Sequence, residues 1–314
     1  MRSPRGSRLA LLGELLLVRA LQVLQVAAAT PLPPDQYVVA RRAIEEMVVV
    51  PSGTFVMGAT AAEQSQALEM CRQQIGKKME RNCTSDRVSS EGPAERVFVS
   101  GFRIDRVEVT VAAYRRCIHA GACDPMPLVT TDPRLVEEDR PVTNLTHGEA
   151  ARFCAWRKAR LPTEAEWERA ARGGDPRLFP WGNQPQRSLA NLGRFLPVEG
   201  QVAPSATPVV QADASDGWPL TAPVGSFPKG ASPFGVLDLA GNVAEWTADY
   251  FAQESPQRSS RYNPRGPASG EARSVRGGSW RMPLFLARTT ARLYADPNER
   301  STEIGFRCVQ PLDP

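Results

Sequence analysis

The residues best suited to metal or redox chemistry in this chain of 314 residues are its six cysteines. Thiolates bind zinc and copper, whereas paired thiols in an oxidising compartment form disulfides. The two pairs closest in sequence lack the C-x-x-C spacing of a zinc site, and the chain has only two histidines that could complete one. The even count therefore predicts disulfides, with these two pairs closing local loops, although spacing alone leaves the full pairing open. The six are Cys71, Cys83, Cys117, Cys123, Cys154 and Cys308.

A serine nucleophile finds no support in the sequence. Ser279 has no histidine nearby in the chain, and a hydrolase needs a base within reach of its serine. The preceding Gly277 and Gly278 are typical of a turn in which the backbone makes a close approach or takes a positive φ. We therefore interpret this segment as a fold element.

The bulk composition excludes one class of function and indicates one class of fold. The 38 basic and 34 acidic residues leave a net charge of only +4, and the arginines form no basic stripe, so nucleic-acid binding is not expected. The 28 prolines and 24 glycines lie throughout the chain and leave room for few long helices. We expect an α+β fold with little regular secondary structure.

The N-terminus is typical of an export signal. Arg2, Arg5 and Arg8 precede an apolar stretch that ends in the small residues 27–29. We expect a signal peptide over residues 1–29, a linker over 30–44 and a secreted or periplasmic protein. Two charges inside the stretch would each cost about 2.5–3.5 kcal/mol near the centre of a bilayer, so no stable membrane span is expected. A mis-assigned start codon or a short cytosolic helix is the alternative.

The remaining chain, residues 45–312, is expected to form a single domain. Two β-branched runs predict short strands over 47–57, and the Ser-Gly turn within 96–111 predicts a hairpin. Helices are expected over 147–158, where Thr146 and Glu149 form a capping box, and after Leu161, where Thr163 and Glu166 repeat it. Trp167 and Trp246 are predicted to lie in the core.

Seven segments occur in an order that resembles one known family. They are MVVVPSGTFVMG (47–58), VEVTVAAY (107–114), FCAWRKARLPTEAEWERAARGG (153–174), FPWGN (179–183), GVLDLAGNVAEW (235–246), RGGSW (276–280) and GFRC (305–308). Together they resemble the formylglycine-generating enzyme and sulfatase-modifying factor family over almost the whole chain after residue 45. The resemblance implies a variant of the C-type lectin fold and a disulfide between Cys154 and Cys308.

The resemblance also implies two calcium sites in loops. In the first, the implied ligands are the side chains of Asn191 and Asp216 and the carbonyls of Leu192 and Trp218. In the second, they are the side chains of Asp238 and Glu245 and the carbonyls of Gly241 and Val243. Mixed carboxylate and carbonyl oxygens are what calcium requires. The alternative is that these carboxylates cap turns or pair with arginine.

The family's oxidase chemistry lacks its ligands in this sequence. Catalytic members oxidise a substrate cysteine to formylglycine, and the resemblance assigns this to two copper(I)-binding cysteines just after the GGS motif. Residues 276–292 contain no cysteine, and none occurs between Cys154 and Cys308. Met282 is a single weak thioether ligand, so copper is not expected. The iron-dependent branch of the fold needs a histidine-rich motif in an additional helical domain, for which this chain has neither the histidines nor the length.

We therefore expect a non-catalytic domain that binds a protein or peptide partner. The expected binding face is cationic and aromatic, suited to acidic peptides or glycans, and consists of Trp280, Arg281, Arg288, Arg292 and Tyr294. An ordinary solvated surface is the alternative for these residues. Two other functions stay open: an oxidoreductase with a divergent site that converts a sulfatase cysteine to formylglycine, and a lectin-like glycan-binding protein.

Overall fold

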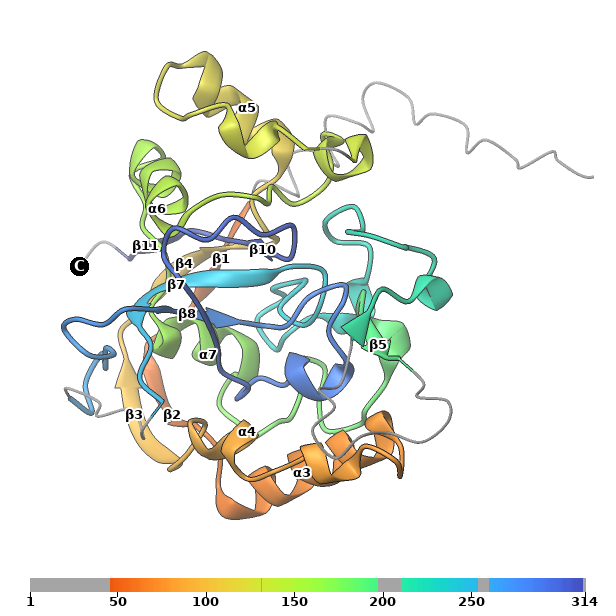
Figure 1. The fold of residues 1–314 in the computed structure, drawn as a ribbon. Helices are drawn as coiled ribbons and strands as arrows, with labels where there is room; N and C mark the ends of the chain where they lie inside the picture. Colours follow the sequence, from red (N-terminus) through yellow and green to blue (C-terminus); the bar gives the residue numbers. More distant parts are fainter. Residues whose placement is uncertain (1–45, 131, 197–209, 254–259, 313–314) are drawn as a thin grey trace, which may run out of the picture. The chain divides into compact units, whose positions relative to one another are not determined.

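The computed structural model describes residues 46–130, 132–196, 210–253 and 260–312 (Figure 1). The expected signal peptide and linker lie outside these residues. Within the described part of the chain, no helix combines the length and the apolar character needed to cross a bilayer.

Four small sheets organise the described residues. A three-stranded sheet has the order β1 (Met47–Val50), β4 (Phe102–Asp105) and β11 (Val309–Pro311), with both pairings antiparallel. A four-stranded sheet has the order β10 (Ile304–Gly305), β7 (Ala244–Tyr250), β8 (Arg273–Arg276) and β9 (Leu293–Ala295). The remaining strands form two pairs, β2 (Gly53–Met57) with β3 (Glu95–Val99) and β5 (Arg194–Phe195) with β6 (Val210–Gln211).

The predicted hairpin over residues 96–111 is wrong, although both of its strands exist. β3 pairs with β2, whereas β4 pairs with β1 and β11, so the Ser100-Gly101 link carries the chain from one sheet to another. β4 has β1 on one side and β11 on the other, so neither of its edges is free to pair with β3. Long-range pairing with β11 decides the arrangement.

The helices are short and well capped. They are α3 (Ala61–Ile75), α4 (Asp86–Ser89), α5 (Val111–His119), α6 (His147–Trp156) and α7 (Glu164–Arg172), with 3-10 turns at Glu80–Asn82, Met126–Leu128, Pro133–Val136, Arg187–Leu189, Ala214–Asp216, Pro228–Gly230 and Leu284–Ala287. The capping boxes predicted for α6 and α7 are confirmed, and Thr60 with Glu63 forms a third at α3. The α+β class with little regular structure is also confirmed.

Helix α7 lies at the centre of the core, and every one of its nine residues is buried. It contacts β2 and β3 as well as β7 and β8, which places it against strands of two different sheets (Figure 1). Trp167 on this helix and Trp246 on β7 are both fully buried, as the sequence predicts. The helix therefore lies against both the β2–β3 pair and the four-stranded sheet.

All six cysteines form disulfides: Cys71 with Cys83, Cys117 with Cys123, and Cys154 with Cys308. The last connects α6 to the segment between β10 and β11 across a sequence separation of 154 residues. It therefore closes by far the longest covalent loop of the three.

The Cys154→Ala/Cys308→Ala variant is expected to lose much more stability than the Cys117→Ala/Cys123→Ala variant. In the chain-entropy model, a loop of 154 residues restricts the unfolded state by about 5 kcal/mol and a loop of 6 by about 2 kcal/mol. Urea unfolding of both variants measures the difference. Equal losses would contradict the expected dominance of the long loop.

Candidate functional site

Three loop segments meet beside the core and form what we call the loop junction: residues 191–193, 238–245 and 277–282. The backbone N–H of Asn242 donates to the Asn191 carbonyl at 2.8 Å. The N–H of Trp280 donates in turn to the Asn242 carbonyl, also at 2.8 Å. These bonds tie both implied calcium loops and the RGGSW segment into one unit.

The glycines of the junction allow this close approach. A Cβ at Gly241, which has a φ of +77°, would lie 2.2 Å from the carbonyl oxygen of Asn191, closer than any side chain could fit. Gly277 and Gly278 have φ values of +95° and +72°, which confirms the predicted turn. The hydroxyl of Ser279 donates to the Glu303 carboxylate at 2.7 Å. The GGS segment is thus a packed turn that the hydrogen bond from Ser279 to Glu303 helps to hold in place.

The first implied calcium loop contains a buried oxygen atom that lacks a partner. The Nδ2 atom of Asn191 donates to the Leu220 carbonyl at 2.8 Å and to Asn242 Oδ1 at 3.1 Å, whereas its Oδ1 is buried and accepts no hydrogen bond from the described residues. Asp216 lies alongside, since its carboxylate accepts the backbone N–H of Leu192 at 3.1 Å. Burial raises the pKa of Asp216 above its usual value. The Asp216 carboxylate also accepts the N–H of Trp218 at 2.9 Å and so caps this turn, whereas a calcium ion would supply the partner that the Asn191 oxygen lacks.

The second implied loop holds more carboxylates than the sequence analysis identified. Asp238 and Glu245 are buried, and Glu108 joins them, accepting the N–H of Val243 at 3.1 Å. Burial, together with the Asp238 and Glu245 carboxylates, raises the pKa of Glu108 well above its usual value. Burial likewise raises the pKa of Asp238 to about 6. Taking these charges out of water is therefore costly in the absence of a cation.

Arg307 compensates part of this negative charge. Its guanidinium forms two hydrogen bonds of 2.7 Å with Glu245, and Trp167 Nε1 donates to the same carboxylate at 2.9 Å. Glu245 is thus paired with arginine, which is the alternative that the sequence left open. The three buried carboxylates of Glu108, Asp238 and Glu245 outnumber the single guanidinium, so a bound cation would balance the remaining negative charge. Among the described residues, however, no three Asp, Glu, His or Cys side chains are grouped as a ready metal cluster.

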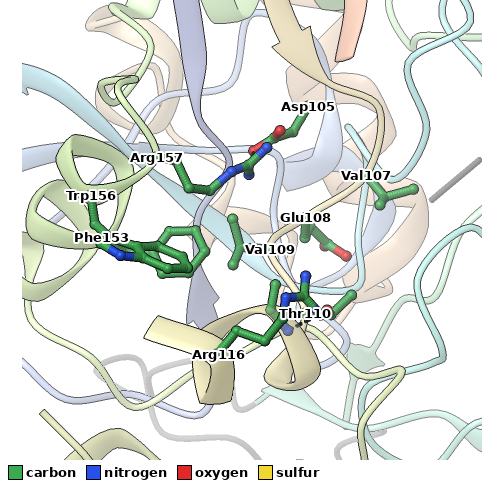
Figure 2. Close-up of a pocket in the computed structure, with 10 residues that line it drawn as sticks. Asp105, Val107, Glu108, Val109, Thr110, Arg116, Phe153, Trp156 and Arg157 are labelled. Carbon is green, nitrogen blue, oxygen red and sulfur yellow. Dashed lines mark hydrogen bonds and ion pairs between the residues drawn. The ribbon is translucent and has the colours of Figure 1, made fainter. Parts of the chain in front are cut away.

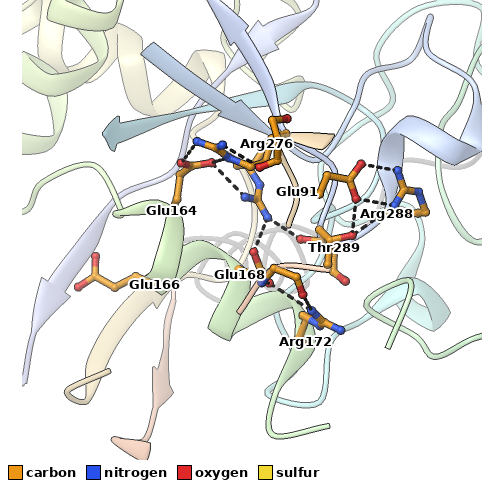
Figure 3. Close-up of polar contacts among 12 residues, drawn as sticks. Glu91, Glu164, Glu166, Glu168, Arg172, Arg276, Arg288 and Thr289 are labelled. Carbon is orange, nitrogen blue, oxygen red and sulfur yellow. Dashed lines mark hydrogen bonds and ion pairs between the residues drawn. The ribbon is translucent and has the colours of Figure 1, made fainter. Parts of the chain in front are cut away.

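The cationic face predicted after RGGSW does not form, and this prediction is corrected. Arg288 is fully buried and makes two hydrogen bonds, of 2.7 and 2.6 Å, to Glu91 (Figure 3). Arg292 is also withdrawn from solvent, because its guanidinium pairs with Glu164 at 2.8 Å. Trp280 is buried as well, and its Nε1 donates to the Thr302 carbonyl. These side chains are structural.

The other two residues of the predicted face, Arg281 and Tyr294, are exposed, but they do not form a patch with the remaining three. Arg281 keeps 42% of its side chain exposed and pairs with Glu303 at 2.9 Å. Tyr294 is 62% exposed and stacks on Phe251, with ring centroids 4.7 Å apart. With their three neighbours buried, neither belongs to the expected binding face.

Three arginines, Arg172, Arg276 and Arg292, pair with the acidic side chains of α7 (Figure 3). Arg276 bridges Glu164 at 3.1 Å and Glu168 at 2.9 Å, and Arg172 donates to Glu168 one turn along the helix. Burial alone would raise the pKa of Glu164, but Arg292 and Arg276 lower it to about 2. Both arginines therefore hold this carboxylate ionised inside the core.

A separate pocket of about 220 Å³ opens between α5 and α6 (Figure 2). Trp156, 39% exposed, and Phe153 form one wall, and Arg157 reaches across it to Asp105 at 2.9 Å. Glu108 also lines this pocket, and its carboxylate accepts the N–H of Val243 in the loop junction. The sequence analysis did not identify the pocket.

The segment where the resemblance places catalytic cysteines is apolar core here. Leu284 and Phe285 are buried in a cluster with Met70 and Cys71 of α3, and the Phe285 N–H donates to Gln74 at 3.2 Å. No cysteine of the chain is free, since all six lie within the described residues and form disulfides. The arrangement offers no thiolate to a soft metal ion.

Comparisons with known proteins agree with this architecture. Residues 35–312 match the family described as "Sulfatase-modifying factor enzyme 1-like domain". The chain is 29% identical over 313 residues to the formylglycine-generating enzyme of Mus musculus, covering 85% of this chain and 75% of that protein. It is 37% identical over 175 residues to the "inactive C-alpha-formylglycine-generating enzyme 2" of Mus musculus, covering 54% and 48%. The structure of PvdO from Pseudomonas aeruginosa aligns with a TM-score of 0.62 and 27% identity over 86% of this chain and 96% of that one.

The Arg288→Ala variant is expected to lower the free energy of unfolding by about 3–5 kcal/mol, because it leaves the buried Glu91 carboxylate without its guanidinium partner and with only the Thr290 hydroxyl bonded to it. Arg134→Ala is the matched control, since Arg134 pairs with Asp132 in solvent and should contribute little. Urea unfolding measures both. A loss as small as that of the control would mean that Arg288 is not the buried partner of Glu91.

Proposed function

The chain belongs to the family of sulfatase-modifying factor enzyme 1-like domains, and on that premise we propose that it is an exported, calcium-stabilised domain that binds a protein or peptide partner without oxidising it. The observation that carries the proposal is the state of the cysteines. All six are oxidised in disulfides, and the segment after Gly278 is filled by buried apolar side chains. The chemistry that the family resemblance implies needs two thiolates at that place.

The relatives support both a catalytic and a non-catalytic reading of the fold. One similar protein is named a formylglycine-generating enzyme and another is named an inactive form. The family therefore includes a protein named inactive that is similar to this chain over 175 residues. Calcium in the first loop would place a positive charge against Asp216 and give the Asn191 Oδ1 atom the contact that it lacks.

The pocket between α5 and α6 is the surface that best supports partner binding. Trp156 and Arg157 are among the residues that line it, and tryptophan and arginine are among the residue types that most often carry binding energy at protein interfaces. We assign the recognition of one partner side chain to this pocket, because the face predicted from Arg288 and Arg292 does not form.

Three disulfides support an oxidising compartment, and we propose that the domain lies outside the cytoplasm, secreted or periplasmic.

An oxidoreductase with a divergent metal site is the second candidate, favoured by the 29% identity to a formylglycine-generating enzyme. Such a site would have to use ligands other than thiolates, and the buried carboxylates of the loop junction are hard ligands that disfavour copper(I). Glycan binding has no comparable observation in its favour.

A peptide oxidation assay separates the two candidates. Purified chain, loaded with copper(I) under oxygen, is incubated with a sulfatase-type Cys-x-Pro-x-Arg peptide, and products are read by mass spectrometry. We expect no formylglycine, because the disulfides leave no thiolate to hold copper(I).

A family member with the cysteine pair serves as the positive control in the same buffer. Repeating the assay after mild reduction tests whether the disulfide cysteines can substitute as ligands. Formylglycine from the unreduced chain would overturn the non-catalytic proposal and require a copper site built from residues assigned here to the fold.

A further inference from the structure

One side chain, that of Asn242, contacts both implied calcium loops. Its Oδ1 atom accepts hydrogen bonds from Asn191 Nδ2 at 3.1 Å and from the Ala222 N–H at 2.8 Å. Its Nδ2 atom donates to Glu108 Oε2 at 2.8 Å. The acceptor end of the amide therefore faces the first loop, and the donor end faces the carboxylates of the second.

The backbone of Asn242 restricts this position to few residue types, and the side-chain contacts restrict it further. Its φ is +57°, in the left-handed region that glycine adopts most easily. Asparagine is among the few other residues that tolerate this region. A glycine would satisfy the backbone alone, but it would leave Asn191 and Glu108 without their contacts.

The contact with the first loop decides which atom of Asn191 is available. Both amide hydrogens of Asn191 have acceptors, the Leu220 carbonyl and Asn242 Oδ1. This fixes the orientation of the amide and leaves its Oδ1 as the buried acceptor without a partner. Asn242 thus presents the oxygen that the first calcium site would use.

The contact with the second loop orients Glu108. One of its carboxylate oxygens accepts from Asn242 Nδ2 and the other from the N–H of Val243, whose carbonyl is an implied calcium ligand. A shift of Glu108 or of the 241–243 backbone toward a cation would move Asn242, and Asn242 would in turn reorient Asn191. The two loops share one bridging amide, and they also approach closely at Gly241, where a Cβ would lie 2.2 Å from the Asn191 carbonyl oxygen.

We propose that Asn242 is a positioning residue that couples the two calcium loops, so that a cation in one raises the affinity of the other. The inference rests on the calcium binding in the proposed function. Such coupling is reciprocal, and its typical size corresponds to a change of about five- to 150-fold in affinity. Calcium would then bind the junction cooperatively and order the RGGSW turn, whose Trp280 N–H is bonded to the Asn242 carbonyl.

The test is a titration of the full chain with calcium and with terbium, whose emission is sensitised by nearby tryptophan. Trp218→Phe identifies the signal of the first loop, because it removes the indole while keeping the backbone carbonyl. Removing a second-loop ligand with Asp238→Ala should lower terbium affinity at the first loop by about tenfold in the otherwise unchanged chain. In an Asn242→Gly background, the same change should alter first-loop affinity by less than about twofold.

An exchange variant separates positioning from a general loss of structure. Asn242→Asp combined with Glu108→Gln swaps donor and acceptor across the hydrogen bond and keeps the acceptor toward Asn191. It should restore the coupling that Asn242→Gly loses. Circular dichroism and urea unfolding of each variant are measured alongside.

The results of these titrations distinguish a failure of coupling through Asn242 from a failure of calcium binding itself. Wild-type chain that binds neither terbium nor calcium contradicts the calcium part of the proposed function and the coupling with it. Two loops that bind independently in the wild type, or coupling that survives Asn242→Gly, overturn the coupling alone.

Discussion

The fold depends on guanidinium groups that are buried together with the carboxylates of one central helix. Every residue of α7 is buried, and its acidic side chains lie against Arg276, Arg292 and Arg172 instead of water. A chain with so few long helices and strands cannot satisfy its interior with backbone ladders alone, so side-chain charge pairs join segments that are far apart. Such pairs contribute little net stability compared with apolar packing, but breaking one leaves a buried charge without a partner. The arrangement of the segments is therefore strongly specified.

The same constraint explains why the loops can carry a site. Arg276 anchors the start of the GGS turn to α7, and Arg307 anchors the last motif to Glu245. Backbone hydrogen bonds then join residues 277–282 to Gly193, Gly241 and Asn242 in the two implied calcium loops. Where related enzymes would be expected to place cysteines, Leu284 and Phe285 extend the apolar core beneath α3. A rigid scaffold that lacks thiolates is suited to presenting a surface to a partner.

How far the sequence predicts this structure depends on how local each interaction is. The capping boxes at Thr146 and Thr163 involve residues three apart and could be predicted, as could the buried tryptophans within clear motifs. The partners of Arg288 could not, because Glu91 lies 197 residues away and an arginine after a turn is as typical of a surface. Glu108 and Asn242 stand inside recognised motifs, yet only the fold shows that one hydrogen bond joins them across 134 residues.

Metal content tests the central claim, a calcium-binding domain without oxidase chemistry, most directly. The purified chain is equilibrated with calcium and copper(I) under non-oxidising conditions, freed of unbound ions, and analysed by elemental mass spectrometry. The account predicts calcium in stoichiometric amount and no retained copper, because the oxygen ligands of the loop junction suit a hard cation and all six cysteines are in disulfides. Copper(I) retained at one ion per chain, with calcium absent, would contradict it.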